Sequence, residues 1–152
     1  MAIDLTIVNS QPMLAGVLSI HWLAITSTTI HKEFKMNIYG KQVVTRNGVT
    51  DVNKLDDLIA DMVVHGWRGR PIIVADMGEW IQAFTGSHRL TAASVTGAIP
   101  ELVWLPSGLT EDEWVGIHFA NDDDDLLRVF QGLVANHPDM TAVVAVMQDE
   151  ID

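Results

Sequence analysis

The sequence contains no cysteine among its 152 residues. Disulfide bonds, thiolate nucleophiles and cysteine-ligated metal sites are therefore excluded. Long apolar runs are also lacking, because the best candidate, residues 13–25, contains His21 and is shorter than the roughly 18 residues that cross a bilayer. The N-terminus carries Asp4 where a signal peptide would have a basic residue. We therefore expect a cytoplasmic protein with no membrane partner.

Basic residues are scarce. Nine Lys and Arg stand against 20 Asp and Glu, which gives a formal net charge of -11. Because proteins bind duplex DNA by neutralising its phosphates with Lys and Arg, this balance argues against an extended DNA-binding surface and leaves room for a local basic pocket. An acidic surface is typical of a soluble protein, and it also suits a basic protein partner or mimicry of nucleic acid.

Hydrophobic residues make up 48% of the chain and charged residues 19%, which is typical of a folded globular protein. The length and the absence of a linker predict a single domain over residues 1–152. Apolar and β-branched runs predict strands within residues 1–50, at 5–8, at 17–25 (with a helix as the alternative), and in a hairpin or pair of short strands at 36–45. Asn47-Gly48 is a strong turn signal.

From Asp51 the apolar period becomes helical, and the helix is expected to end at Gly66. Strands at 71–74 and 79–85, a helix at 87–96 and a strand at 100–105 follow. These elements predict an α+β fold, with a small mixed sheet flanked by helices and a helical C-terminal part over residues 110–148.

Local signals place the C-terminal helices. Thr110-Glu-Asp-Glu113 matches a capping box and predicts a helix to about residue 119. The acidic run Asp122–Asp125 precedes another helical face, where acids favour the helix dipole. A last helix is expected over 140–147, with residues 149–152 frayed.

Two glycine-containing segments stand out as a candidate site, Gly66-Trp-Arg-Gly-Arg-Pro-Ile-Ile-Val74 and Thr85-Gly-Ser-His-Arg-Leu-Thr-Ala-Ala93. The second segment opens a helix, whose start offers unpaired N–H groups and a positive dipole end. A hydroxyl, an imidazole and a guanidinium on that first turn suit a phosphate. The predicted phosphate site is therefore Gly86, Ser87, His88 and Arg89. The alternatives are a solvated first turn and, for Ser87, a simple N-cap.

The first segment offers possible helpers. Arg68 and Arg70 flank a glycine and can reach an anion in the same pocket, or belong to a solvated loop. Trp67 is in place to flank a nucleotide base, although tryptophans are more often core anchors.

The order and spacing of these two boxes, followed by Gly97 and Pro100, resemble the ParB/sulfiredoxin superfamily over about residues 51–105. The resemblance implies a compact domain that binds a nucleoside triphosphate, ATP or CTP with Mg²⁺. Its phosphates would lie on Gly86, Ser87, His88 and Arg89, and Pro71 with its strand would help wall the pocket.

The sequence departs from the known activities of that superfamily. Sulfiredoxins have a reactive cysteine where this chain has Ser87, so their chemistry is excluded. ParB proteins have a second phosphate motif, an Asn followed by an Arg, whereas here Asn121 is followed by four aspartates. The serine-kinase group often has an acid where this chain has Thr85.

Two functions follow as expectations. The first is nucleotide binding, with Mg²⁺-dependent hydrolysis of a triphosphate or phosphodiester. Asp122 and Asp124 are the candidate Mg²⁺ ligands, and a solvated helix cap is their alternative role. No general base is identified. The second is a catalytically inactive, acidic interaction or inhibitor protein of a phage or plasmid, acting on a basic protein partner.

Overall fold

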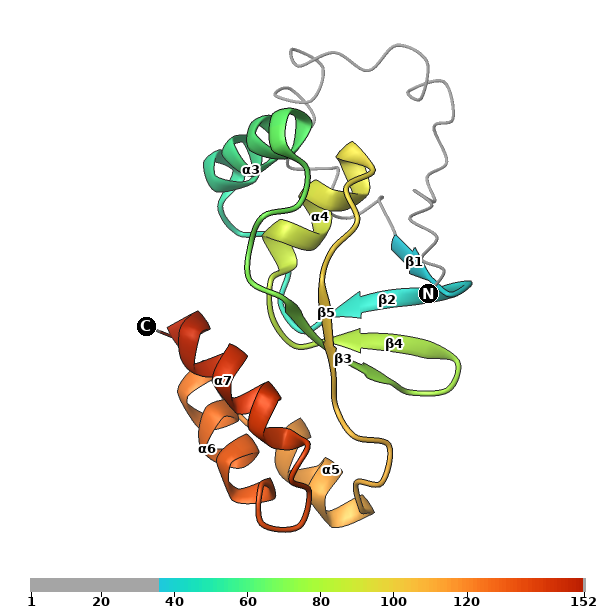
Figure 1. The fold of residues 1–152 in the computed structure, drawn as a ribbon, viewed down its shortest axis with the longest axis vertical. Coiled ribbons are helices and arrows are strands. Elements are labelled where there is room, and N and C mark those ends of the chain that lie inside the picture. Colours follow the sequence, from blue (N-terminus) through green and yellow to red (C-terminus); the bar gives the residue numbers. More distant parts are fainter. Residues whose placement is uncertain (1–35, 152) are drawn as a thin grey trace.

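The computed structural model describes residues 36–151, so the strands predicted at 5–8 and 17–25 lie outside the described residues. Within this range, five strands form one mixed sheet in the order β1-β2-β4-β3-β5 (Figure 1). The strands are β1 (Met36–Ile38), β2 (Lys41–Thr45), β3 (Ile72–Asp76), β4 (Trp80–Ala83) and β5 (Leu102–Trp104). Strands β2 and β4 are parallel, as are β3 and β5, whereas β1–β2 and β3–β4 are antiparallel.

The hairpin predicted at 36–45 is confirmed, with its turn at Tyr39-Gly40. Both turn residues have positive φ, 55° and 76°, which suits a two-residue turn between twisted strands. Asn47-Gly48 instead lies where the chain leaves β2 for α3 (Val52–His65). The sheet is curled, since Tyr39 stacks on Trp104 of β5 with ring centroids 6.1 Å apart.

Strand β3 is buried on both faces. Ile72 and Val74 belong to the core beneath α3 and α4 (Ser87–Thr96), whereas Ile73 and Ala75 belong to a second core. The alternation follows from the two-residue period of a strand. One strand thus separates two hydrophobic layers.

The second core is formed with the three C-terminal helices, α5 (Glu111–His118), α6 (Asp123–Leu133) and α7 (Met140–Ile151). These helices lie together on the opposite side of the sheet from α3 and α4 (Figure 1). The α+β fold with a helical C-terminal part is confirmed. No helix in the described part of the chain is long and apolar enough to cross a membrane.

The predicted fraying of residues 149–152 is wrong for residues 149–151, which continue α7. The helix is held to its end by two contacts that the local sequence does not reveal. Ile151 packs against the second core, and the carboxylate of Glu150 pairs with Arg89.

Candidate functional site

Among the residues that the structure describes, no side chain caps the start of helix α4. Its N-cap is Gly86, in the left-handed conformation with φ 70° and ψ 37°. Ser87, considered as a cap from the sequence, is instead the first helical residue, and its hydroxyl lies 3.4 Å from the carbonyl oxygen of Gly48. Helices α3, α5 and α6, by contrast, each begin with a side chain that accepts a backbone N–H. The first amides of α4 therefore keep their capacity to bind an external acceptor.

A cavity of about 430 Å³ lies at this helix start. Gly86, Ser87, His88 and Arg89 all line it, together with residues from β2, the β2–α3 connection, α3, α6 and α7. The other lining residues are Thr45, Arg46, Asn47, Gly48, Thr50, Lys54, Phe84, Thr85, Asp123 and Glu150. The cavity thus lies between the α/β part of the chain and the C-terminal helices.

Arg89 is held from several sides. One guanidinium nitrogen, Nη1, donates to the carbonyl oxygen of Arg70, and Nη2 donates to Glu150 Oε2 at 2.8 Å. The guanidinium carbon lies 5.7 Å from the centre of the Trp67 ring, a cation–π distance. Only 13% of the Arg89 side chain is exposed. The group is therefore fixed in place before any ligand arrives.

The glycines of the two sequence boxes make room for this side chain. A Cβ at Gly69 would lie 3.2 Å from Arg89 Cδ, and a Cβ at Gly86 would lie 3.1 Å from Arg89 Nη2. At Gly86 the same Cβ would also come within 2.2 Å of Ile72 Cδ1, so the buried Ile72 side chain would have to shift. The two glycine-containing segments thus enclose the Arg89 side chain, which explains their spacing.

His88 connects α4 to the start of α3. Its Nε2 accepts the backbone N–H of Asp51 at 3.1 Å, which leaves the ring proton on Nδ1. Burial lowers the pKa of His88, and the nearby Lys54 ammonium lowers it further. At neutral pH His88 therefore carries its proton on Nδ1 and adds no positive charge to the cavity.

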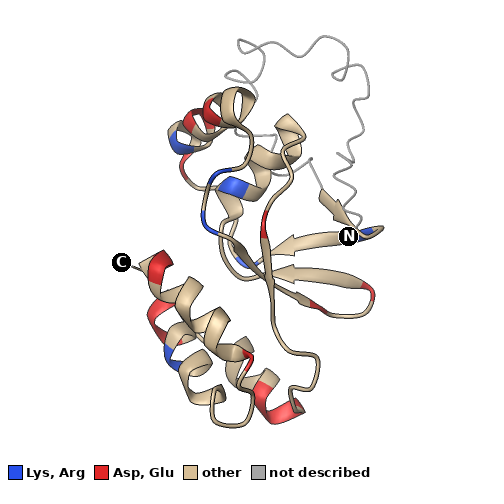
Figure 2. Ribbon diagram, viewed as in Figure 1, with Lys and Arg blue, Asp and Glu red and all other residues tan. Residues whose placement is uncertain are grey.

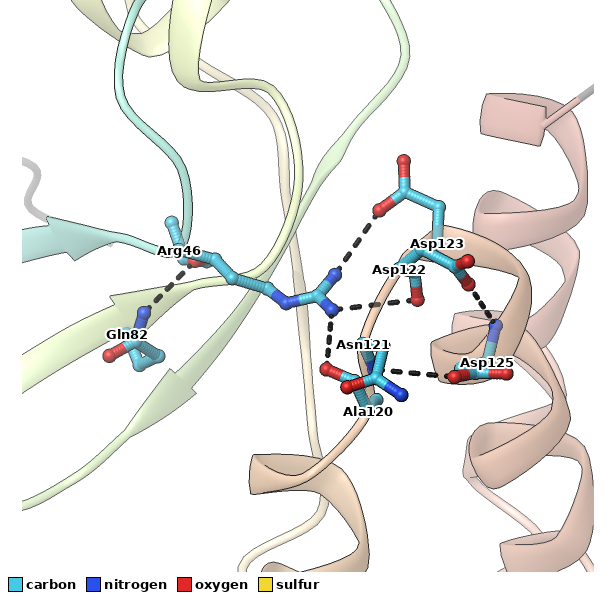
Figure 3. A network of polar contacts seen from close by, with 8 residues as sticks. Arg46, Gln82, Ala120, Asn121, Asp122, Asp123 and Asp125 are labelled. Atoms are coloured by element: carbon cyan, nitrogen blue, oxygen red, sulfur yellow. Dashed lines mark hydrogen bonds and ion pairs between the residues drawn. The ribbon is translucent and has the colours of Figure 1, made fainter.

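Arg46 follows the end of β2 and lines the cavity. Figure 3 shows its guanidinium directed toward the segment that begins α6. Its Nη1 donates to Asp123 Oδ1 at 3.2 Å, and its Nη2 donates to the carbonyl oxygen of Ala120 at 2.9 Å. The Arg46 guanidinium, which is distant in sequence, therefore lies near Asn121. In the sequence itself, Asn121 is followed by four aspartates.

The predicted metal ligands lie in a neighbouring cavity of about 560 Å³, which shares Arg46, Asp123 and Glu150 with the first. Asp122 acts there as the N-cap of α6, because its Oδ1 accepts the N–H of Asp125 at 2.8 Å. Among residues 36–151, no group of three or more His, Asp or Glu side chains is placed to hold a metal ion. Mg²⁺ binding by Asp122 and Asp124 stays a prediction.

The predicted helpers from the first box do not line the cavity. The Arg68 guanidinium pairs with Asp61 at 2.6 Å and lowers the pKa of that carboxyl. Arg70 supplies its backbone carbonyl to Arg89, and Trp67 packs against the first core. Pro71 is also absent from the described lining. The loop at residues 66–71 lies against Arg89 and supports it, through the Arg70 carbonyl and the Trp67 ring.

Four charged lining residues were missed by the sequence reasoning, namely Arg46, Lys54, Asp123 and Glu150. Two of them carried a usable signal. Arg46 is a cation at a strand end in a cation-poor chain, and Lys54 lies in the first turn of a predicted helix. Glu150 carried none, because its partner is 61 residues away.

Comparisons with protein-family profiles, with curated protein sequences and with solved structures return no match to this chain. The resemblance to the ParB/sulfiredoxin superfamily therefore stays a prediction.

Proposed function

We propose that this chain is a cytoplasmic protein that binds a nucleotide, ATP or CTP with Mg²⁺, by its phosphates in the cavity at the start of α4. One observation carries the proposal: an uncapped helix start opens into a cavity lined by three cations, in a chain whose net charge is -11. Helix N-termini and cations together favour phosphate. The volume of about 430 Å³ lies in the usual range of small-molecule sites.

The cations of the cavity differ in their availability. Arg46 and Arg89 already pair with Asp123 and Glu150. Lys54 is exposed and has no carboxylate within ion-pair distance in the described range. We therefore assign Lys54 the first electrostatic contact with an incoming phosphate, followed by the amides of α4 and the Ser87 hydroxyl.

The proposal ranks binding ahead of hydrolysis. Phosphoryl transfer depends on charge neutralisation and on a group that orients the attacking water. The two carboxylates that line the cavity, Asp123 and Glu150, are both engaged by arginines, and the His88 Nε2 lone pair is occupied by Asp51. Turnover would require one of these groups to be released.

Titration calorimetry with ATP, CTP and GTP in the presence of Mg²⁺ tests the proposal. We expect at least one nucleotide to bind and Lys54→Ala to weaken it about tenfold, the effect of losing one charge-assisted contact. Lys41→Ala is the matched control, because Lys41 pairs with Asp76 away from the cavity. Absence of heat with all three nucleotides, or equal losses in the two variants, would contradict the proposal.

A second function is favoured by the same ion pairs. Both arginines of the described cavity are neutralised by the chain's own carboxylates, as expected if the cavity no longer binds a ligand. Acidic residues also occur on α3, α5, α6 and α7 (Figure 2). We propose as the alternative an acidic interaction protein of a mobile element with a basic protein partner. A stoichiometric partner retained equally by the wild type and by Lys54→Ala, with no nucleotide binding, would favour it.

A further inference from the structure

The carboxylate of Glu150, in the last turn of α7, binds Arg89 Nη2 beside the cavity at the start of α4. The distance from Nη2 to Oε2 is 2.8 Å, and the side chains are only 13% and 19% exposed. Glu150 also lines the cavity at the start of α4. An anion that reaches Arg89 therefore meets this carboxylate first.

We propose that Glu150 is a built-in competitor for the phosphate on Arg89, so that ligand binding releases the last turn of α7. The inference rests on the proposed function and adds a regulation to it. At Arg89 Nη2, the carboxylate of α7 and a phosphate oxygen of the ligand would compete for the same donor.

Arg89 cannot avoid this competition by moving. Its Nη1 is held by the Arg70 carbonyl, and its face lies on the Trp67 ring. The two anions therefore compete for a cation that stays in place. Because the pair is largely buried, Arg89 left without an anion would be costly, so departure of Glu150 is coupled to arrival of another anion.

Of the two residues in this ion pair, Glu150 is easier to displace than Arg89. A carboxylate in the last turn of a helix is opposed by the negative end of the helix dipole, so Arg89 is what favours its position. Only Ile151 follows it in α7, and terminal turns open at low free-energy cost. The penalty for release is thus confined to one helical turn.

Glu150→Gln tests the competition, because glutamine keeps the side-chain length and removes the charge. The matched control is Asp149→Asn, which removes the same charge from an exposed neighbour outside the cavity lining. With calorimetry on MgATP and on inorganic tripolyphosphate, we expect about tenfold tighter binding for Glu150→Gln, within the usual range of coupling between sites, and no change for Asp149→Asn. Tighter binding of both probes would show that the position beside Arg89 accepts phosphate in general. Tighter binding of MgATP alone would show that it requires a nucleotide.

Hydrogen exchange on the unaltered chain gives a second readout that needs no variant. Saturating MgATP should lower the protection of amides at residues 149–151 and leave those in the middle of α7 unchanged. Equal affinities with unchanged exchange would overturn the competition and leave the proposed function standing. Absence of binding by the wild type and by both variants would overturn the proposed function and this inference with it.

Discussion

At the scale of single residues, Arg89 determines which residue types its neighbours can be. Gly69 and Gly86 are small because the guanidinium and its stem pass beside them, and Trp67 presents its ring to the charge. A sequence pattern that suggests a row of phosphate ligands therefore serves, in part, to enclose the side chain of Arg89. This packing keeps the cation rigid, which is what preorganised anion binding requires.

Gly86→Ala tests the close packing at Gly86. We expect it to lower the free energy of unfolding by about 2 to 4 kcal/mol, because a left-handed φ and a steric clash with Ile72 act together. Gly97→Ala is the control at the other end of α4, since its φ is also positive at 79° but no atom lies within 4 Å of the added Cβ. Urea denaturation compares them, and equal losses would contradict the account of Gly86.

The residues of the cavity were predicted only where they are neighbours in sequence. Gly86, Ser87, His88 and Arg89 are consecutive, so one helix start brings them together. Arg46 and Asp123 are 77 residues apart, and their contact depends on how α6 packs against the end of β2. Long-range pairs of this kind leave no periodic signal in a single sequence.

At the scale of elements, local chemistry explains why most boundaries could be predicted. Asp51 caps α3 and accepts the N–H of Lys54, Gly66 ends α3, and Gly97 ends α4 in the left-handed conformation. These signals act within a few residues, so sequence alone reveals them. The end of α7 was missed for the opposite reason, because Arg89 lies on another helix and fixes it from there.

The capping box of α5 gives a prediction at this scale. Thr110 Oγ1 accepts the Glu113 N–H at 3.2 Å, and Glu113 Oε1 accepts the Thr110 N–H at 2.8 Å. Glu113 additionally contacts His137 Nε2 at 2.8 Å, which ties α5 to the segment between α6 and α7. We expect Thr110→Ala to cost about 1 kcal/mol in urea denaturation, and Glu113→Ala to cost more.

The pH dependence tests the contribution of the Glu113 charge. The Thr110 N–H, and after it His137, lower the pKa of Glu113 below its ordinary value of 4.5. A lowered carboxyl pKa stabilises the fold above the ordinary value, and this stabilisation is lost as pH falls through the lowered one. The difference between wild type and Glu113→Ala should therefore shrink in acid. A difference that grows in acid would contradict this role.

At the scale of the whole molecule, two ion pairs join the sheet and its upper helices to the C-terminal helices. Arg46 reaches α6 through Asp123, and Arg89 reaches α7 through Glu150. Both pairs lie at the same cavity. A ligand that binds there would act on the junction between the two hydrophobic cores, which is why we expect binding to be felt in the C-terminal helices.

Arg89→Ala and Arg68→Ala separate a structural arginine from a surface one. Loss of Arg89 leaves the largely buried Glu150 without its partner, and we expect a loss of about 2 to 4 kcal/mol in the free energy of unfolding. Arg68 is 61% exposed and its ion pair with Asp61 lies on the surface, so its removal should change stability little. Thermal denaturation of both variants checks the contrast, which similar losses would contradict.

The most direct test of the central claim is a titration of the ¹⁵N-labelled chain with MgATP, followed by backbone amide chemical shifts. The account predicts that the amides of Ser87, His88 and Arg89 shift first and furthest, together with Lys54 across the cavity. Saturation should follow one binding isotherm. Unshifted amides at the start of α4, or shifts confined to surfaces away from the cavity, would contradict nucleotide binding at this site.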